Sequence, residues 1–183
     1  RATKHSGAWM SDFRSQSHLD ELVTPIVINC CNFAKSDPCL LSMDEVRTLF
    51  HEFGHGLHGL LSKVRYPSQS GTNVRQDFVE LPSQIMEHWA TEPEVMLQYA
   101  RHVDSGEAIP MSLVEKLIAS EKFNQGFATS EYLAASYLDL AWHEIGEDIP
   151  DVHALETAVA KDIGLNEAID PRYLSTYFKH IFE

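Results

Sequence analysis

The chain has 183 residues, of which 44% are hydrophobic and 22% are charged, the composition of a globular domain. This excludes a collagen-like fibre and a low-complexity linker, and no apolar run approaches the ~20 residues that cross a bilayer. Asp and Glu outnumber Lys and Arg by 27 to 14, which gives a formal net charge of −13. Because nucleic-acid-binding domains usually present a basic face, we expect neither nucleic acid nor a membrane as a partner.

The cysteines are few and poorly placed for a disulfide framework. Cys30 and Cys31 are adjacent, Cys39 follows, and the chain has no C-x-x-C pair. This favours a reducing compartment, so we expect a cytoplasmic location. The first residue is Arg1 rather than Met, and we therefore also expect the 183 residues to be part of a longer polypeptide.

The first third of the chain predicts one strand and one well-defined helix. Residues 1–18 are polar and rich in turn formers, whereas residues 25–33 are rich in Val, Ile and Cys and predict a β-strand. Ser42 and Glu45 have the spacing of a capping box, which predicts a helix that begins there and ends near residue 61. A loop is expected to follow, up to residue 76.

The remaining chain predicts further helices. Asp77 and Glu80 offer a second capping box for a helix ending near residue 90, with Pro82 in its first turn, where proline is tolerated. A new helix is predicted to begin near Pro93, and another near Ser112. Later helices are predicted up to residue 145, with an interruption at 124–126, and then over 152–163 and 171–182. The fold class is therefore mainly α, with one or two strands near the start.

Residues 51–55, His-Glu-Phe-Gly-His, form an H-E-x-x-H motif inside the helix predicted from its cap. Residues four apart on a helix differ by ~40° in azimuth and lie ~6 Å apart along the axis. The imidazoles of His51 and His55 can therefore converge on one tetrahedral metal ion. Glu52 lies ~100° round from His51, beside that ion, where it can take a proton from water. The motif predicts a metal-dependent hydrolase.

A catalytic zinc takes three protein ligands and keeps one position open. Glu80, 25 residues after His55, is the best third ligand if the two predicted helices pack side by side. His58 is a rival, but it lies ~10 Å from His51 along the helix axis, which favours a packing role. Glu87 shares the helix face of Glu80. It could accept a hydrogen bond from a ligand histidine, or it could be a solvated surface residue.

Residues 51–58, HEFGHGLH, together with residues 77–84, DFVELPSQ, resemble the M3 family of zinc oligopeptidases. The resemblance extends over nearly the whole chain. It includes residues 7–10, 31–33, 70–72 and 123–127, and residues 128–142 are most similar to the peptidyl-dipeptidase branch.

This resemblance implies one zinc ion per chain, with His51, His55 and Glu80 as ligands and Glu52 as general base and acid. It implies a mainly α, zincin-like catalytic core with a small N-terminal β element, part of a much longer helical ellipsoid. Residues 1–183 would then be one metallopeptidase region, truncated at both ends and completed by the remainder of the parent polypeptide. His180 matches a family histidine that binds substrate and steadies the oxyanion, although the family's accompanying tyrosines would follow the last residue.

The implied function is hydrolysis of short peptides by release of C-terminal dipeptides. Two alternatives remain open: internal cleavage of oligopeptides by an enzyme of the same family, and an inactive zinc-binding fragment. A chance motif in a structural helical domain is a third. The strand ending at residues 31–33 could offer its edge to an extended substrate or be an ordinary sheet strand. The loop over 63–76 is long for a connection, which favours a binding role.

Overall fold

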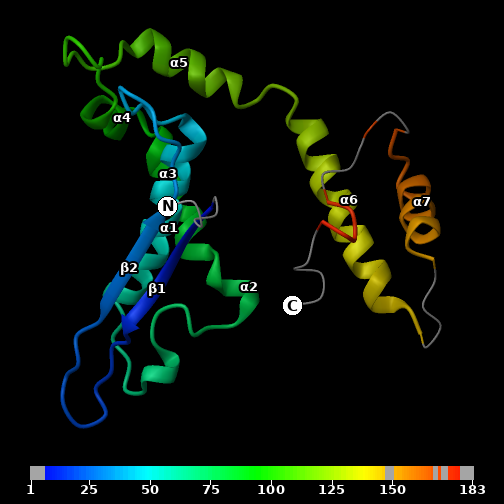
Figure 1. Ribbon diagram of the computed structural model, residues 1–183, viewed down its shortest axis with the longest axis horizontal. Helices are drawn as coiled ribbons and strands as arrows, with labels where there is room; N and C mark the ends of the chain where they lie inside the picture. The colour runs from blue at the N-terminus through cyan, green and yellow to red at the C-terminus, as the bar shows by residue number, and fades with distance from the viewer. Residues whose placement is uncertain (1–6, 147–150, 167–168, 170–172, 178–183) are drawn as a thin grey trace. The chain divides into compact units, whose positions relative to one another are not determined.

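The computed structural model describes residues 7–146, 151–166, 169 and 173–177 (Figure 1). The chain divides into two compact units, residues 1–118 and 119–183. The first unit holds a two-stranded sheet and a series of helices, and the described part of the second holds two helices. The mainly helical fold with a small N-terminal sheet confirms the predicted fold class. No described helix combines the length and apolar character that a bilayer crossing requires.

The sheet pairs β1 (Ala8–Arg14) with β2 (Ile26–Cys31) in antiparallel register, with Ala8 opposite Cys31 and Met10 opposite Asn29. Strand β2 lies inside the segment that the sequence predicts as a strand. Strand β1 contradicts the expectation that residues 1–18 form polar turns. The strand forms through its pairing with β2, which the composition of residues 8–14 alone does not indicate: Asp12 lies on the less exposed face, whereas Trp9 and Phe13 are exposed.

Helix α1 (Met43–Leu60) has the predicted capping box. The Ser42 hydroxyl accepts a hydrogen bond from the Glu45 backbone N–H at 3.2 Å, and the Glu45 carboxylate accepts one from the Ser42 N–H at 2.8 Å. Two otherwise unpaired donors of the first turn are thereby satisfied. Asp44 and Glu45 also place negative charge at the positive end of the helix dipole.

Helix α1 packs between the sheet and α3 (Leu81–Thr91), and its glycines make this possible. A Cβ at Gly54 would lie 2.6 Å from the Cα of Ser83 on α3. A Cβ at Gly56 would lie 3.3 Å from the side-chain oxygen of Asn29 on β2. The backbones on both sides of α1 therefore approach more closely than side chains would allow, which brings the H-E-x-x-H segment close to α3.

The second predicted capping box is wrong. Residues 76–91 form two helices, α2 (Gln76–Val79) and α3, with Glu80 between them. Asp77 lies inside α2, which begins after Arg75, and neither helix has a side-chain cap bond. The Glu80 side chain turns toward the histidines of α1 instead of back to the chain. Pro82 lies in the first turn of α3, as predicted.

The other connections and helices follow the sequence closely. A short 3-10 helix, η1 (Pro67–Gln69), lies in the long loop. The later helices begin within a residue or two of their predicted starts: α4 (Pro93–Tyr99), α5 (Met111–Ser120), α6 (Gln125–Glu144) and α7 (Val152–Asp162). Asn124 has a left-handed backbone conformation, with φ of 55°, at the predicted interruption before α6.

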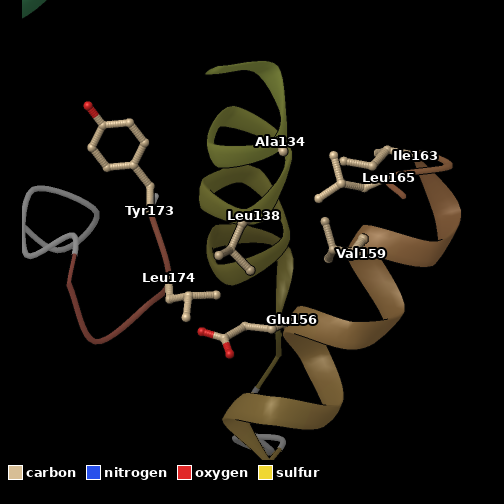
Figure 2. A pocket seen from close by; sticks show the side chains of 9 residues that line it. Ala134, Leu138, Glu156, Val159, Ile163, Leu165, Tyr173 and Leu174 are labelled. Atoms are coloured by element: carbon tan, nitrogen blue, oxygen red, sulfur yellow. The ribbon is translucent and has the colours of Figure 1, made fainter. Parts of the chain in front are cut away.

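The second unit has its own small core between α6 and α7 (Figure 2). Leu138 on α6 faces Val159 and Ile163 on α7 around an apolar cavity of about 30 Å³. The indole N–H of Trp142 donates to the Ser175 hydroxyl at 2.8 Å and ties the following segment to α6. Of the helix predicted over 171–182, residues 173–177 are described and end in a turn, and the rest lies outside the described residues.

Candidate metal centre

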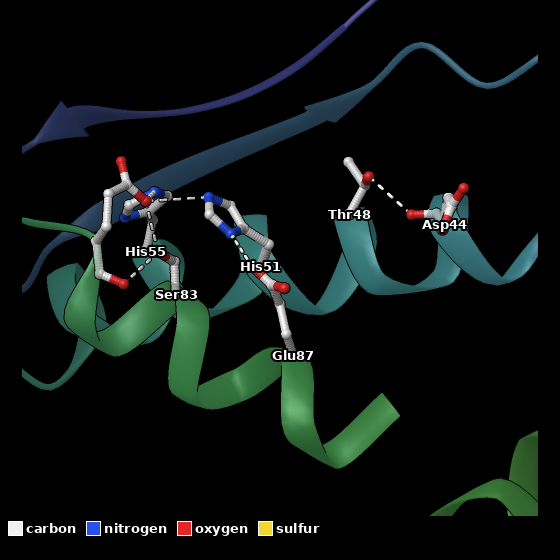
Figure 3. Close-up of polar contacts among 7 residues, drawn as sticks. Asp44, Thr48, His51, His55, Ser83 and Glu87 are labelled. Atoms are coloured by element: carbon white, nitrogen blue, oxygen red, sulfur yellow. Dashed lines mark hydrogen bonds and ion pairs between the residues drawn. The ribbon is translucent and has the colours of Figure 1, made fainter. Parts of the chain in front are cut away.

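The structure brings His51 and His55 of α1 together with Glu80, the residue that precedes α3. Figure 3 shows the two histidines with Ser83 and Glu87 of α3 beside them. One carboxylate oxygen of Glu80, Oε2, lies 3.1 Å from Nε2 of His51 and 3.1 Å from Nε2 of His55. One ligand atom from each residue lies within 4.8 Å of the other two, and these three residues could hold a metal ion. The two imidazole rings meet edge to face, with centroids 4.9 Å apart.

Glu80 is held in this position by the break between α2 and α3. Its backbone occupies the residue that precedes α3, and its carboxylate Oε2 lies 2.7 Å from the hydroxyl of Ser83, which is completely buried. The same hydroxyl lies 2.9 Å from the backbone oxygen of Glu80. The single hydroxyl hydrogen of Ser83 is thus shared between the Glu80 carboxylate and the Glu80 backbone oxygen, which is possible because three residues span nearly one helical turn.

Glu87 orients the first histidine. Its carboxylate accepts a hydrogen bond from Nδ1 of His51 at 2.6 Å. A carboxylate of this kind only accepts, so an imidazole hydrogen lies on Nδ1, and in the neutral ring the lone pair of Nε2 faces Glu80. Histidines that bind metals characteristically have such a partner on the other ring nitrogen, because it fixes the tautomer and the ring plane. Of the two possibilities for Glu87, the structure favours the contact with a histidine.

The donor set and its spacing fit a tetrahedral ion. A metal bound at about 2.0–2.2 Å by imidazole nitrogen and carboxylate oxygen places neighbouring donor atoms about 3.3–3.6 Å apart in tetrahedral geometry. The two nitrogen–oxygen distances of 3.1 Å are close to this range. When the histidines are neutral, their Nε2 lone pairs and the Glu80 carboxylate repel each other at this distance, and a cation between them removes that repulsion. The residues present therefore fit a bound metal ion.

Glu52 lies next to the cluster but does not belong to it. Glu52 is a buried residue of α1, and it lines the same cleft as the three cluster residues. Burial raises the pKa of Glu52, the imidazoles of His51 and His55 oppose that shift, and the Glu80 carboxylate adds to it. A buried carboxylate with a raised pKa beside a metal position has the properties of a general base.

The cluster opens into a cleft with a volume of about 370 Å³. Ala8, Trp9 and Met10 of β1 line it, together with Thr72, Gln76 and Val79 from the loop and α2. The strand that lines this cleft is β1 rather than β2, so the possibility that the strand end at residues 31–33 offers its edge to a substrate stays a prediction. The expectation that the loop over 63–76 contributes to a binding site is supported by Thr72.

The sequence also singles out two further histidines, His58 and His180. His58 is outside the three-residue cluster, its ring lies 6.2 Å from that of Phe78, and its Nδ1 is buried without a hydrogen-bond partner. Burial lowers the pKa of His58, and the nearby His55 lowers it further. This agrees with the packing role favoured by the sequence. His180 lies outside the described residues, so its assignment to substrate binding stays a prediction.

The family model of peptidase family M3 matches residues 1–183, the whole chain. The chain belongs to this family. Among curated proteins, the M3 chain is 48% identical to the dipeptidyl carboxypeptidase of Escherichia coli over 190 aligned residues, covering all of this chain and 28% of that protein. It is 35% identical to oligopeptidase A of the same organism, covering all of this chain and 27% of that protein.

A more distant relative shares part of the same region. The mitochondrial intermediate peptidase of Botryotinia fuckeliana is 38% identical over 146 residues, which cover 77% of this chain and 18% of that protein. The M3 chain thus spans only 28% of the length of the dipeptidyl carboxypeptidase and 27% of the length of oligopeptidase A. The resemblance of the two zinc segments to family M3, stated from the sequence, is confirmed.

Proposed function

We propose that this M3 chain carries the zinc site of a peptidase that releases dipeptides from the C-terminus of short peptides. The observation that supports this most directly is the convergence of His51, His55 and Glu80 beside a buried Glu52. In this proposal residues 1–183 form a metal-binding catalytic region, and the remainder of a longer polypeptide completes the substrate channel. We also propose a cytoplasmic location, from the sparse and unpaired cysteines.

Each residue of the site has a separate role in the proposed peptide hydrolysis. A bound zinc would supply Lewis-acid polarisation of the scissile carbonyl and of water. Glu52 accepts the proton of the attacking water and passes it to the leaving amine, and its burial strengthens it as a base. Glu87 keeps the hydrogen of His51 on Nδ1, so that Nε2 faces the metal position. His180 would donate a hydrogen bond to the oxyanion, as the family resemblance implies.

The choice of dipeptide release follows from the relatives. The chain is 48% identical to a dipeptidyl carboxypeptidase and 35% identical to an oligopeptidase, over the whole chain in both cases. An oligopeptidase that cleaves internal bonds is therefore the second candidate. A zinc-binding fragment without activity is the third, because the chain spans only 28% of the first relative.

One experiment separates the three. The zinc content of the protein is measured, and N-acetylated hexapeptides with a free or an amidated C-terminus are incubated with it and analysed by mass spectrometry. Dipeptide release requires cleavage of the free-acid peptide at its penultimate bond and resistance of the amidated peptide. Equal internal cleavage of both peptides would contradict dipeptide release and support the oligopeptidase function. Bound zinc without cleavage of either peptide would support the inactive fragment.

The role of Glu52 is tested in the same assay. Glu52→Gln is expected to keep one zinc ion and to lower kcat by a factor of about 10²–10⁴, the usual contribution of a positioned general base. Glu94→Gln changes a glutamate on α4, away from the cleft, and serves as the matched control. Unchanged turnover in Glu52→Gln would exclude Glu52 as the base.

A further inference from the structure

The loop that follows α1 is tied to β1 by one buried glutamine. The side-chain amide of Gln16 pairs with both backbone groups of Val64, since its Nε2 donates to the Val64 oxygen at 3.2 Å and its Oε1 accepts from the Val64 N–H at 2.8 Å. The Gln16 backbone N–H donates to the Ser70 hydroxyl at 3.2 Å. Gln16 is 2% exposed and Ser70 is 0% exposed. Three hydrogen bonds, one buried and two part-buried, thus fix this loop to the segment that follows β1.

The next residue, Gly71, is fixed to the end of α1. Its N–H donates to the Ser62 hydroxyl at 2.7 Å, and it has a positive φ of 55°. A Cβ at Gly71 would lie 3.0 Å from the Cα of Gly59, so loop and helix backbones are in direct contact here. Only glycine combines this φ with so close an approach. These contacts fix the backbone at Gly71 and therefore the position of the residue that follows it.

The residues that follow this fixed point line the cleft. Thr72 is the next residue along the chain, and Gln76 begins α2 four residues later. Both line the cleft that contains His51, Glu52, His55 and Glu80. Within the described residues, no hydrogen bond or ion pair uses the Thr72 hydroxyl or the Gln76 amide. Two uncommitted polar groups are thus presented to the cleft from a rigid support.

The chemistry of these two groups indicates what they bind. A side-chain amide and a hydroxyl each offer a donor and an acceptor, as a peptide unit does. Among the described residues that line the cleft, none is a lysine or an arginine, so this wall offers no cation for a carboxylate. The groups match the neutral N–H and C=O of a peptide backbone better than they match a charged end.

We propose that Thr72 and Gln76 bind the main chain of the peptide substrate, and that the Gln16–Ser70 contact sets their position. This inference rests on the proposed peptidase function and adds two substrate-contacting residues and one positioning residue to it. Thr72 and Gln76 act by direct hydrogen bonds. Gln16 acts only through the loop, because its own amide is fully used by Val64.

The test compares Gln76→Ala and Thr72→Val with the unchanged zinc-loaded protein, and uses Gln98→Ala as control. Gln98 is a glutamine of α4 whose amide bonds within its own helix. Each of the first two variants is expected to raise KM for an N-acetylated hexapeptide about tenfold with kcat and zinc content unchanged, as loss of one hydrogen bond to bound substrate does. The dissociation constant of the C-terminally amidated peptide is expected to rise by the same factor.

The positioning role is tested by Gln16→Met, which keeps the volume and removes both side-chain bonds. It is expected to raise KM with unchanged zinc content, and Gln16→Met combined with Gln76→Ala is expected to raise KM less than the product of the two single effects. A product of independent effects would overturn the positioning role. If Gln16→Met does not fold, Ser70→Ala replaces it in the same cycle.

Failure of this inference is distinct from failure of the proposed function. An unchanged protein that binds zinc and hydrolyses peptides, with unaltered KM in Gln76→Ala and Thr72→Val, overturns the inference alone. An unchanged protein without zinc or hydrolysis overturns the proposed function. In that event the peptide dissociation constants still decide whether Thr72 and Gln76 bind a peptide backbone.

Discussion

Replacing Gly54 by alanine should separate the two helices that form the metal centre. The added Cβ would lie 2.6 Å from the Ser83 Cα and 2.7 Å from the Pro82 oxygen, whereas ordinary contact begins at 3.4 Å. Helix α3 must therefore retreat by about 0.8 Å, because both obstructing atoms belong to its backbone. Glu80 immediately precedes α3. A shift of this size exceeds the roughly 0.5 Å within which a functional site keeps its geometry.

The matched control is Gly56→Ala, two residues further along α1. Its Cβ would meet the side-chain oxygen of Asn29 at 3.3 Å, the end of a side chain that can adjust. Both substitutions gain the same helix propensity, so their difference isolates the overpacking of α3. We expect Gly54→Ala to be about 1–3 kcal/mol less stable than Gly56→Ala.

Hydrogen exchange of α1 amides in urea measures this difference in the first unit alone, and competition with a chelator measures zinc affinity. Zinc should bind at least tenfold more weakly to Gly54→Ala than to Gly56→Ala. Equal unfolding free energies and equal zinc affinities in the two variants would refute the argument that the close α1–α3 approach builds the site.

Two further predictions follow from single contacts. Glu87→Ala should weaken zinc binding by about 10–100-fold, because His51 loses the carboxylate that orients it; Glu94→Ala is the control, and equal zinc affinities in chelator competition would count against the role of Glu87. Backbone hydrogen bonding from Ser42 holds the pKa of Glu45 below its ordinary value of 4.5. The ionised carboxylate therefore stabilises α1 above that value, and this stabilisation disappears as the pH falls through the lower folded-state pKa. The urea midpoints of the unchanged protein and Glu45→Gln should differ at pH 7 and converge as the pH falls below 4.5, and a constant difference would contradict this.

Local patterns in the sequence predict most of the first helix and its motif. The capping box of Ser42 and Glu45 involves residues three apart, and His51 and His55 share a helix face, so neither depends on the rest of the fold. Glu80, which the sequence predicts as the third ligand, is the residue whose carboxylate lies against both histidines in the structure. Short-range geometry decides the capping box and the histidine pair, whereas Glu80 is predicted from the three protein ligands that a catalytic zinc needs.

The failures depend on distant partners. Asp77 and Glu80 have the spacing of a capping box, but the Glu80 carboxylate meets two imidazoles and a serine hydroxyl, and these compete successfully with the backbone N–H. Strand β1 forms because β2 and α1 cover it, which its polar residues do not reveal. The contacts of Gln16 with Val64 and Ser70 join segments about 50 residues apart, and no local pattern indicates them.

The cluster combines two residues of α1 with Glu80, which follows His55 by 25 residues. Only the folded chain brings these residues together, so a metal ion held by them would bind the folded state alone. A ligand that binds only the folded form stabilises it by RT ln(1 + [L]/Kd), about 2.7 kcal/mol at a free concentration of 100 Kd. All three residues belong to the unit formed by residues 1–118. The folded population of that unit should therefore follow the free metal concentration in its surroundings, so that metal scarcity would act on protein abundance as well as on activity.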